Sequence, residues 1–220
     1  MISCMKRRTP STGPDRAAAL EQYRRRAAVY DWELAAFEPL RRAAIAALAL
    51  QPGDVVIDVG CGTGLSLPAL HQAVGGRGEV IGIEQSPEMI ALARQRVAKH
   101  GWRHVRLLEA PVELADIGVR ADAALFHFTH DIQQTPAALA NVLGHLKPGA
   151  RVVATGLKWV EPGLAWSGNL FVLLAAMRSV SSLAGLEAPW AMLQQQLGPL
   201  LVEPRLMGAA YVARGVVAQA

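Results

Sequence analysis

The chain has 220 residues, of which 52% are apolar and 18% charged, and its formal net charge is +4. This composition excludes a disordered chain and suits a single domain with one substantial core. The positive excess lies in residues 1–42, which hold nine basic and five acidic side chains, whereas the rest of the chain is balanced. This distribution argues against nucleic acid as a partner, because a nucleic-acid enzyme usually shows its basic surface on the folded domain. It indicates a solvated arm or, as the alternative, peripheral contact with an anionic membrane.

Cysteine use and hydropathy both predict a soluble cytoplasmic protein. The two cysteines, Cys4 and Cys61, cannot form a disulfide framework, which favours a reducing compartment. Residues 1–12 are polar and basic without an apolar run after them, so we expect no secretory signal. Residues 164–186 are interrupted by polar side chains and fall short of a membrane span.

The N-terminal part of the chain is expected to be helical. Residues 15–50 are rich in Ala, Arg, Leu and Glu, which favour helices, and Pro39 should restart one of two or three helices there. We therefore predict a helical arm and cap over residues 1–50 and a main domain over residues 51–220. A helical, apolar insert at about residues 158–198 is expected to form a lid on that domain.

Strand and helix patterns alternate from residue 55 onward. Glycine-rich or proline-containing turns separate short apolar runs from helical segments, and Gly208 sits between two final apolar runs. The sequence therefore predicts an α/β three-layer sandwich of the Rossmann-like type, with a seven-stranded, mostly parallel sheet and an antiparallel C-terminal hairpin strand. The expected strands are 55–59, 79–84, 105–109, 121–128, 151–155, 200–206 and 210–217; the expected helices are 65–74, 87–100, 136–146 and much of 161–198.

A glycine-rich loop follows the first strand, and its spacing points to a particular kind of ligand. Asp58 precedes glycines spaced G-x-G-x-G, whereas a dinucleotide loop has the spacing G-x-G-x-x-G. A carboxylate at this place would repel a pyrophosphate but can accept a hydrogen bond from an ammonium group. The second strand ends at Glu84, whose two oxygens can hold both hydroxyls of a ribose. The pattern favours a nucleoside that carries an amino acid and disfavours an NAD-dependent oxidoreductase.

These residues resemble motifs I and II of the class I S-adenosylmethionine-dependent methyltransferases, and the likeness runs from about Tyr23 to Val217. The resemblance implies S-adenosyl-L-methionine as the cofactor and implies no metal. It places the methionine moiety at Asp58 and the glycine loop, the ribose at Glu84, and the adenine at Glu109, where this sequence has Glu in place of the usual Asp. The full set of implied cofactor-binding residues is Tyr23, Asp58, Gly60, Cys61, Gly62, Gly64, Glu84, Gln85, Met89, Glu109, Ala110 and Phe126.

Within this family, residues 23–32 are similar to the N-terminal segment of the quinone-pathway C-methyltransferases, of the type 11 group, and of soluble bacterial phosphatidylethanolamine N-methyltransferases. There an aromatic side chain of the segment lies over the cofactor, which is the role that the resemblance gives to Tyr23. Packing of a helix on the sheet is the alternative explanation for this aromatic residue.

Acceptor chemistry is expected where the fourth strand ends. His130 and Asp131 are the candidates for acid–base catalysis, because histidine titrates near neutral pH, and His127 is a candidate substrate contact. A strand role for His127 and a turn-capping role for Asp131 are the alternatives. In the insert, Trp159 and Trp166 are candidate substrate contacts and favour an apolar pocket, although apolar residues of such an insert also serve as core.

The sequence therefore predicts methyl transfer to a small, largely apolar molecule, such as a lipid, a quinone-like compound or a secondary metabolite. The alternative is a protein that binds S-adenosylmethionine without turnover, as a sensor or partner subunit. The binding motifs alone do not separate these two functions, because they govern binding and not transfer.

Overall fold

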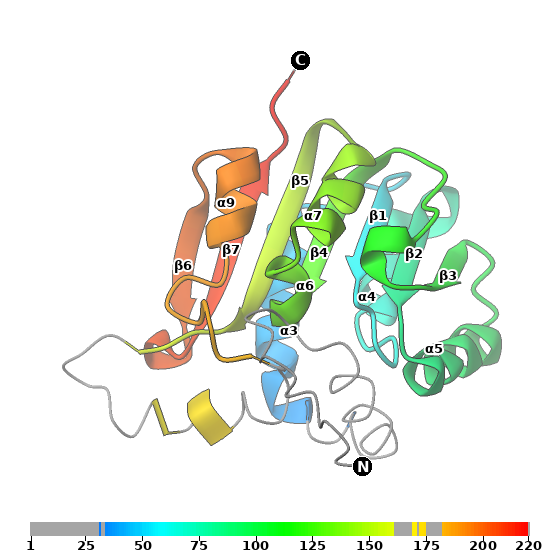
Figure 1. Ribbon diagram of the computed structural model, residues 1–220. Helices are drawn as coiled ribbons and strands as arrows, with labels where there is room; N and C mark the ends of the chain where they lie inside the picture. The colour runs from blue at the N-terminus through cyan, green and yellow to red at the C-terminus, as the bar shows by residue number, and fades with distance from the viewer. Residues whose placement is uncertain (1–30, 32–33, 161–168, 171, 175–181, 220) are drawn as a thin grey trace, which may run out of the picture.

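The structure, a computed structural model, describes residues 31, 34–160, 169–170, 172–174 and 182–219. A seven-stranded sheet with the order β3-β2-β1-β4-β5-β7-β6 forms its centre (Figure 1). Strand β7 runs opposite to the other six strands, which confirms the predicted architecture. The strand order reverses between β1 and β4, and ligands of open α/β sheets bind at such a point. The strands are β1 (Val55–Val59), β2 (Glu79–Glu84), β3 (Val105–Glu109), β4 (Ala121–His127), β5 (Leu146–Leu157), β6 (Leu201–Arg205) and β7 (Ala210–Val216).

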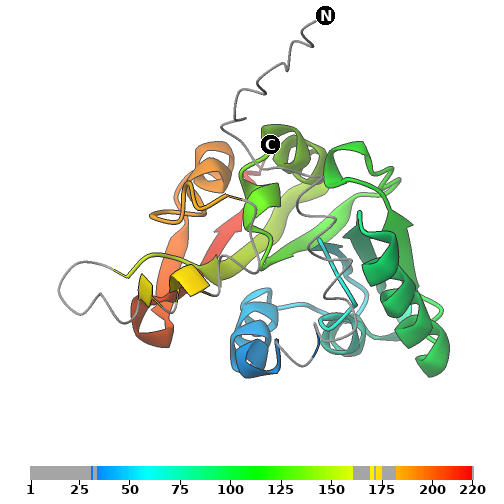
Figure 2. The same ribbon diagram turned by 60° about the horizontal axis from the view of Figure 1, so that its bottom comes forward.

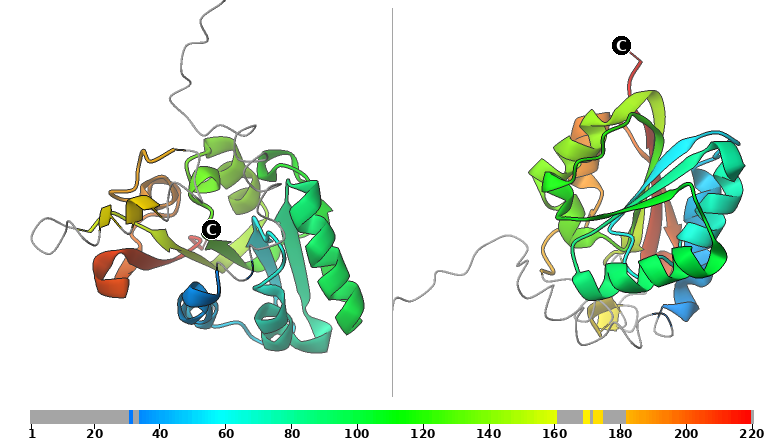
Figure 3. Two further views of the ribbon diagram at one scale, coloured as in Figure 1. Left: turned by 90° about the horizontal axis from the view of Figure 1, so that it is seen from below. Right: turned by 90° about the vertical axis from the view of Figure 1, so that its right-hand side faces the viewer.

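Helices cover both faces of the sheet and make three layers (Figures 2 and 3). The helices α3 (Glu38–Ala47), α4 (Leu67–Val74) and α5 (Pro87–His100) pack on one face, and α7 (Pro136–Gly144) and α9 (Ala191–Leu197) pack on the other. Each face has its own buried cluster of apolar side chains. The shorter helical elements are α6 (His130–Gln133), η1 (Ala35–Phe37), η2 (Gly75–Arg77), η3 (Val112–Leu114) and η4 (Leu206–Gly208).

Local sequence signals explain the ends of α5. The hydroxyl oxygen of Ser86 accepts a hydrogen bond from the backbone N–H of Met89 at 3.3 Å, and Pro87 occupies the first turn. Gly101 ends the helix in the left-handed region, with φ of 65°. Asp and glycine-rich turns before and after β1 and β2 likewise explain why these two strands begin and end where the sequence predicts.

Helix α3 lies within the arm expected over residues 1–50, yet it packs directly on the sheet. Its buried side chains at positions 40, 44 and 45, together with Leu48, fill the cluster beneath β4 and β5. Pro39 stands in its first turn, as the sequence predicts. The described part of this segment is therefore part of the core of the domain.

Several expected boundaries were wrong, each for a local reason. The helix expected from residue 65 begins at Leu67, and β4 ends at His127 because Phe128 adopts a positive φ of 56°. Helix α7 ends at Gly144, and β5 already begins at Leu146, which pairs with Ala121 across a register shift.

The insert differs more from expectation. Helix α9 and residues 169–170 and 172–174 are helical as expected, but residues 182–190 form turns, with Gly185 at φ of 80°. Most of the remaining insert and residues 1–30 lie outside the described residues, and Tyr23 and Trp166 lie there with them. Among the helices that the structure does describe, none combines the length and the hydropathy needed to cross a bilayer.

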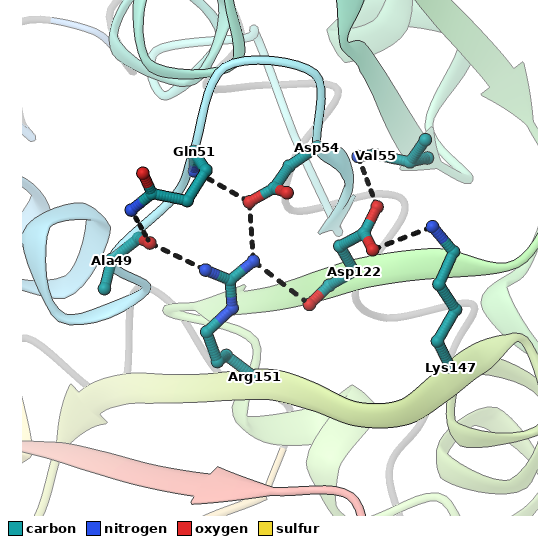
Figure 4. A network of polar contacts seen from close by, with 7 residues as sticks. All are labelled: Ala49, Gln51, Asp54, Val55, Asp122, Lys147 and Arg151. Carbon is teal, nitrogen blue, oxygen red and sulfur yellow. Dashed lines mark hydrogen bonds and ion pairs between the residues drawn. The ribbon is translucent and has the colours of Figure 1, made fainter.

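A polar network anchors the edge of the sheet where β1 and β4 begin (Figure 4). The guanidinium of Arg151 on β5 donates to the carbonyl of Ala49 and to the carboxylate of Asp54, each at 2.6 Å. Asp122 accepts from the ammonium of Lys147 at 2.7 Å and from the backbone N–H of Val55 at 2.9 Å. These bonds hold the turn before β1 against β4 and β5. They thereby fix the position of β1 in the sheet, and with it the position of the glycine loop at the other end of that strand.

We expect Arg151→Met to lower the free energy of unfolding by about 2 kcal/mol, because Asp54 and the carbonyl of Ala49 lose a charged donor. Urea unfolding at pH 7 checks this. Arg214→Met is the matched control, since Arg214 pairs with Glu203 on the exposed hairpin and should contribute much less to stability. Equal losses for both variants would contradict the structural role given to Arg151.

Candidate cofactor-binding site

The loop that joins β1 to α4 is shaped by its glycines. Gly60 has φ of 66°, and a Cβ atom there would lie 2.7 Å from the methyl carbon of Thr129. Gly64 has φ of 83°, and a Cβ there would lie 2.7 Å from a methyl carbon of Leu67. Any other residue would therefore be strained in its backbone and crowded in its side chain. The backbone N–H of Cys61 donates to the carbonyl of Ile83 at 2.9 Å, which ties the loop to β2.

Glu84 is the last residue of β2, and its side chain holds the glycine loop in place. One carboxylate oxygen accepts from the backbone N–H of Gly62 at 3.1 Å, and the other accepts from that of Ser86 at 2.7 Å. Burial raises the pKa of this carboxyl, although the hydrogen bonds from Ser86 and Gly62 oppose that rise. Each oxygen has lone pairs left to accept from a ligand hydroxyl. The geometry thus suits the ribose-binding role implied for Glu84.

A pocket opens beside the loop, on the face of the sheet that α3 and α4 cover. Asp58 at the end of β1, His127 at the end of β4 and Arg41 of α3 meet there, although they are far apart in the sequence. Asp58 and Arg41 are almost fully buried, with 2% and 3% of their surface exposed. The described residues that line the pocket are Leu34, Arg41, Asp58, Gly60, Cys61, Thr63, Leu65, Ser66, His127 and Phe128.

Polar atoms of these three side chains have no hydrogen-bond partner among the residues that the structure describes. They are one carboxylate oxygen of Asp58, Nε of Arg41 and both ring nitrogens of His127. Burial raises the pKa of Asp58 to about 7, against the charge of Arg41, which lowers it, while Glu84 adds to the rise. Burial, with the charge of Arg41, lowers the pKa of His127 to about 3. Native proteins seldom leave buried polar atoms unpaired, so these groups fit a ligand with an ammonium and a carboxylate.

The remaining implied cofactor residues lie at or near the same edge. Glu109 ends β3 opposite Glu84 in the sheet register, and its exposed carboxylate pairs with Arg94 at 2.6 Å. The backbone N–H of Ala110 donates to the carbonyl of Glu84 at 3.1 Å, and Gln85 follows directly in the chain. Met89 and Phe126 have fully buried side chains, and that of Phe126 belongs to the core cluster on the α7 face.

The candidate acid–base residues lie just beyond β4. Nε2 of His130 is 2.8 Å from the carbonyl oxygen of Ala184, so it must carry the proton that this acceptor receives. His130 thereby holds the turn segment 182–190 over α6, and it does not line the pocket described above, whereas His127 does. The carbonyl of Asp131 accepts from the hydroxyl of Thr135 at 2.9 Å.

Phe128, which lines the pocket, belongs to a group of packed aromatic side chains. The rings of Phe37 and Phe128 pack edge to face with centroids 4.9 Å apart, and Phe128 contacts His127 in the same way at 4.8 Å. Trp159 packs against the small apolar cluster of Leu157, Val172 and Ala209, to which both phenylalanines also belong. Phe37, Phe128 and Trp159 are named the aromatic cluster below.

Sequence reasoning missed Arg41, Thr63 and Phe128 as site residues. A signal for Arg41 was present, because it lies on the helical stripe formed by Leu40, Ala44 and Ile45, where a charge is unusual. The contact between Phe37 and Phe128 could not be foreseen, since it depends on how the segment before α3 lies against the end of β4.

Known methyltransferases are similar to this chain in part of its sequence and in its fold. Residues 56–149 match the model of a family described as a methyltransferase domain. The fold is similar to that of the N-methyltransferase NodS from Bradyrhizobium japonicum, solved in complex with S-adenosyl-L-homocysteine, with a TM-score of 0.67 and 17% sequence identity. The alignment covers 90% of this chain and 98% of the NodS chain. A SAM-dependent methyltransferase from Aquifex aeolicus gives 0.56 at 20% identity, covering 81% and 89%. Residues 56–149 are thus similar to a methyltransferase domain, and the whole fold is the Rossmann-like fold of S-adenosylmethionine-dependent methyltransferases.

Among curated relatives, an arsenite methyltransferase from Halobacterium salinarum is 33% identical over 119 residues, 52% of this chain and 30% of the relative. A 2-phytyl-1,4-naphtoquinone methyltransferase from Synechococcus elongatus is 31% identical over 117 residues, 50% of this chain and 49% of the relative. An uncharacterized 37.1 kDa transposon protein from Streptomyces fradiae is 37% identical over 117 residues, 51% and 33% of the two chains. The matched part of this chain therefore spans a half or less of these relatives.

Proposed function

We propose that this protein transfers the methyl group of S-adenosylmethionine to a small, largely apolar molecule. The observation that carries the proposal is the pocket beside the glycine loop, where the buried acid Asp58 has an unpaired oxygen and Glu84 stands at the end of the next strand. When bound, the cofactor supplies a methyl group on a sulfonium, which is already activated for displacement. The residues of this chain would bind the cofactor, orient the acceptor and exclude water.

The apolar character of the acceptor is supported by the aromatic cluster, whose member Phe128 contacts His127 and lines the pocket. Aromatic side chains are typical of sites that bind ring compounds and lipids. Two relatives of this chain bear the names of quinone methyltransferases, which is consistent with an acceptor of that kind.

His130 is proposed as the group that removes a proton from the acceptor, with Asp131 beside it and His127 as an acceptor contact. Its Nδ1 is buried without a partner in the described structure, so it has the lone pair of a base once Nε2 donates to Ala184. His130→Gln keeps a donor for that carbonyl but lacks a base. We expect this variant to lose roughly a hundredfold or more in turnover while cofactor affinity and thermal stability stay near those of the natural chain. Turnover within threefold of the natural chain would limit His130 to a positioning role.

Turnover itself is tested with S-adenosylmethionine labelled in its methyl group, incubated with the purified protein and an organic-solvent extract of cells. We expect label in the organic phase together with an equal amount of S-adenosylhomocysteine. Glu84→Ala is the matched control and should give neither product. A different result is that the natural chain binds the cofactor yet forms no more S-adenosylhomocysteine than Glu84→Ala does. That result would instead favour a binding protein that acts as a sensor or partner subunit.

A further inference from the structure

Arg41 is a buried cation on the face of α3 that otherwise carries apolar side chains. Only 3% of its surface is exposed, and its guanidinium pairs with Glu38, one turn earlier in the same helix. The side chain of Glu38 is 40% exposed, so it reaches Arg41 from the solvent side. Nε of Arg41 has no partner among the described residues. Within the described part of the chain, one donor of the guanidinium therefore remains without an acceptor.

The surroundings of Arg41 show which kind of ligand could use that donor. It lines the same pocket as Asp58 and His127, and no ion pair joins Arg41 to Asp58 in the part of the chain that the structure describes. A buried guanidinium that is only partly paired is costly, whereas an apolar residue at this position would simply continue the stripe of Leu40, Ala44 and Ile45. The charge of Asp58 in the same pocket offsets part of this cost. An anionic group that enters the pocket would satisfy the donor of Arg41 that remains.

We propose that Arg41 binds the carboxylate of the amino acid portion of the cofactor, opposite Asp58, which accepts from its ammonium. The proposal rests on the proposed function, since it concerns the same pocket. A planar guanidinium matches a carboxylate through two parallel hydrogen bonds, which neither Lys nor a neutral side chain reproduces. Arg41 and Asp58 then present opposite charges from two elements, α3 and β1, and so select a zwitterion rather than a plain nucleoside.

Decarboxylated S-adenosylmethionine tests this directly, because it keeps the nucleoside, the sulfonium and the amine and lacks only the carboxylate. Calorimetric titration of the full chain should show S-adenosylmethionine binding more tightly than the decarboxylated compound by about tenfold to a hundredfold. In Arg41→Met this preference should shrink to less than about threefold, through weaker binding of S-adenosylmethionine with little change for the decarboxylated compound. Arg41→Lys should keep part of the preference.

Arg42→Met is the matched control, because Arg42 is adjacent, has a side chain that is 75% exposed and pairs with the same Glu38 at 3.0 Å. It should keep the full preference. If Arg41→Met loses affinity equally for both ligands, the role of Arg41 is purely structural and the inference is wrong. The inference is also wrong if Arg41→Met still prefers S-adenosylmethionine as strongly as the natural chain does. If Arg41→Met does not fold, the natural chain and Arg41→Lys still decide: equal affinity of the natural chain for both ligands refutes the role of Arg41. Binding of neither ligand by the natural chain would refute the proposed function itself.

Discussion

Replacing Glu84 with alanine is expected to weaken the binding of S-adenosylhomocysteine by about two to three orders of magnitude. A buried carboxylate that accepts from two ribose hydroxyls contributes about 1.5–3 kcal/mol for each bond, and each 1.4 kcal/mol is a factor of ten. The same substitution removes the acceptor of the backbone N–H groups of Gly62 and Ser86, so the loop also loses support. Calorimetric titration measures the affinity.

Two further variants separate these effects. Glu84→Gln keeps one acceptor oxygen for the loop and should lose affinity with a smaller loss of thermal stability. Glu79→Ala is the matched control, because Glu79 lies at the other end of β2 and pairs with Arg106 at 3.0 Å. It should bind as the natural chain does. If Glu84→Ala binds S-adenosylhomocysteine as tightly as the natural chain, then Glu84 does not bind the ribose and the proposed ribose site is wrong.

Cofactor affinity is expected to rise with pH between pH 5.5 and about pH 7. Burial raises the pKa of Asp58 to about 7 in the unliganded protein, so most molecules carry a proton on this carboxyl at pH 5.5. Only the carboxylate form of Asp58 can accept a hydrogen bond from the ammonium group of the ligand. Binding must therefore release the proton that Asp58 carries at low pH. Affinity should therefore increase by up to about tenfold for each pH unit below pH 7.

The same raised pKa has the opposite consequence for the unliganded fold. The folded chain holds the proton of Asp58 more tightly than the unfolded chain, whose carboxyl has a pKa near 3.8. Its contribution to stability is therefore present at low pH and is lost as the pH rises from about 4 through 7. The thermal shift produced by S-adenosylhomocysteine should accordingly grow over this range.

Titrations at several pH values, in two buffers with different heats of ionisation, measure the proton release directly. Asp58→Asn is the control and should bind weakly, with a flatter dependence on pH. Affinity in the natural chain that is constant or that falls from pH 5.5 to 7 would contradict the role given to Asp58.

Much of the sheet could be predicted from the sequence because its strands are short apolar runs bounded by turns. The strands β1, β2 and β3 begin and end as predicted. The start of β5 could not be predicted, because Leu146 pairs with Ala121 only through an irregular register in which Pro148 is tolerated. Composition suggested helix for residues 182–190, but Gly185 in the left-handed region and Pro189 break it there.

The candidate site was predictable to the extent that its residues are contiguous in the chain. The glycine loop and Glu84 follow from local spacing, and the structure brings them together at one edge. Arg41 is different, since its meeting with Asp58 and His127 depends on how α3 packs across the sheet. Alternation along β4 places His127 on the same face as Asp58, whereas His130 follows after the strand has ended.

Calorimetric titration of the purified full chain with S-adenosylhomocysteine, followed by the same titration with NADH, distinguishes a site for a sulfur nucleoside from a site for a dinucleotide. We expect one site per chain with micromolar-range affinity for S-adenosylhomocysteine and no heat from NADH. Heat from NADH alone, or from neither compound, would contradict this expectation.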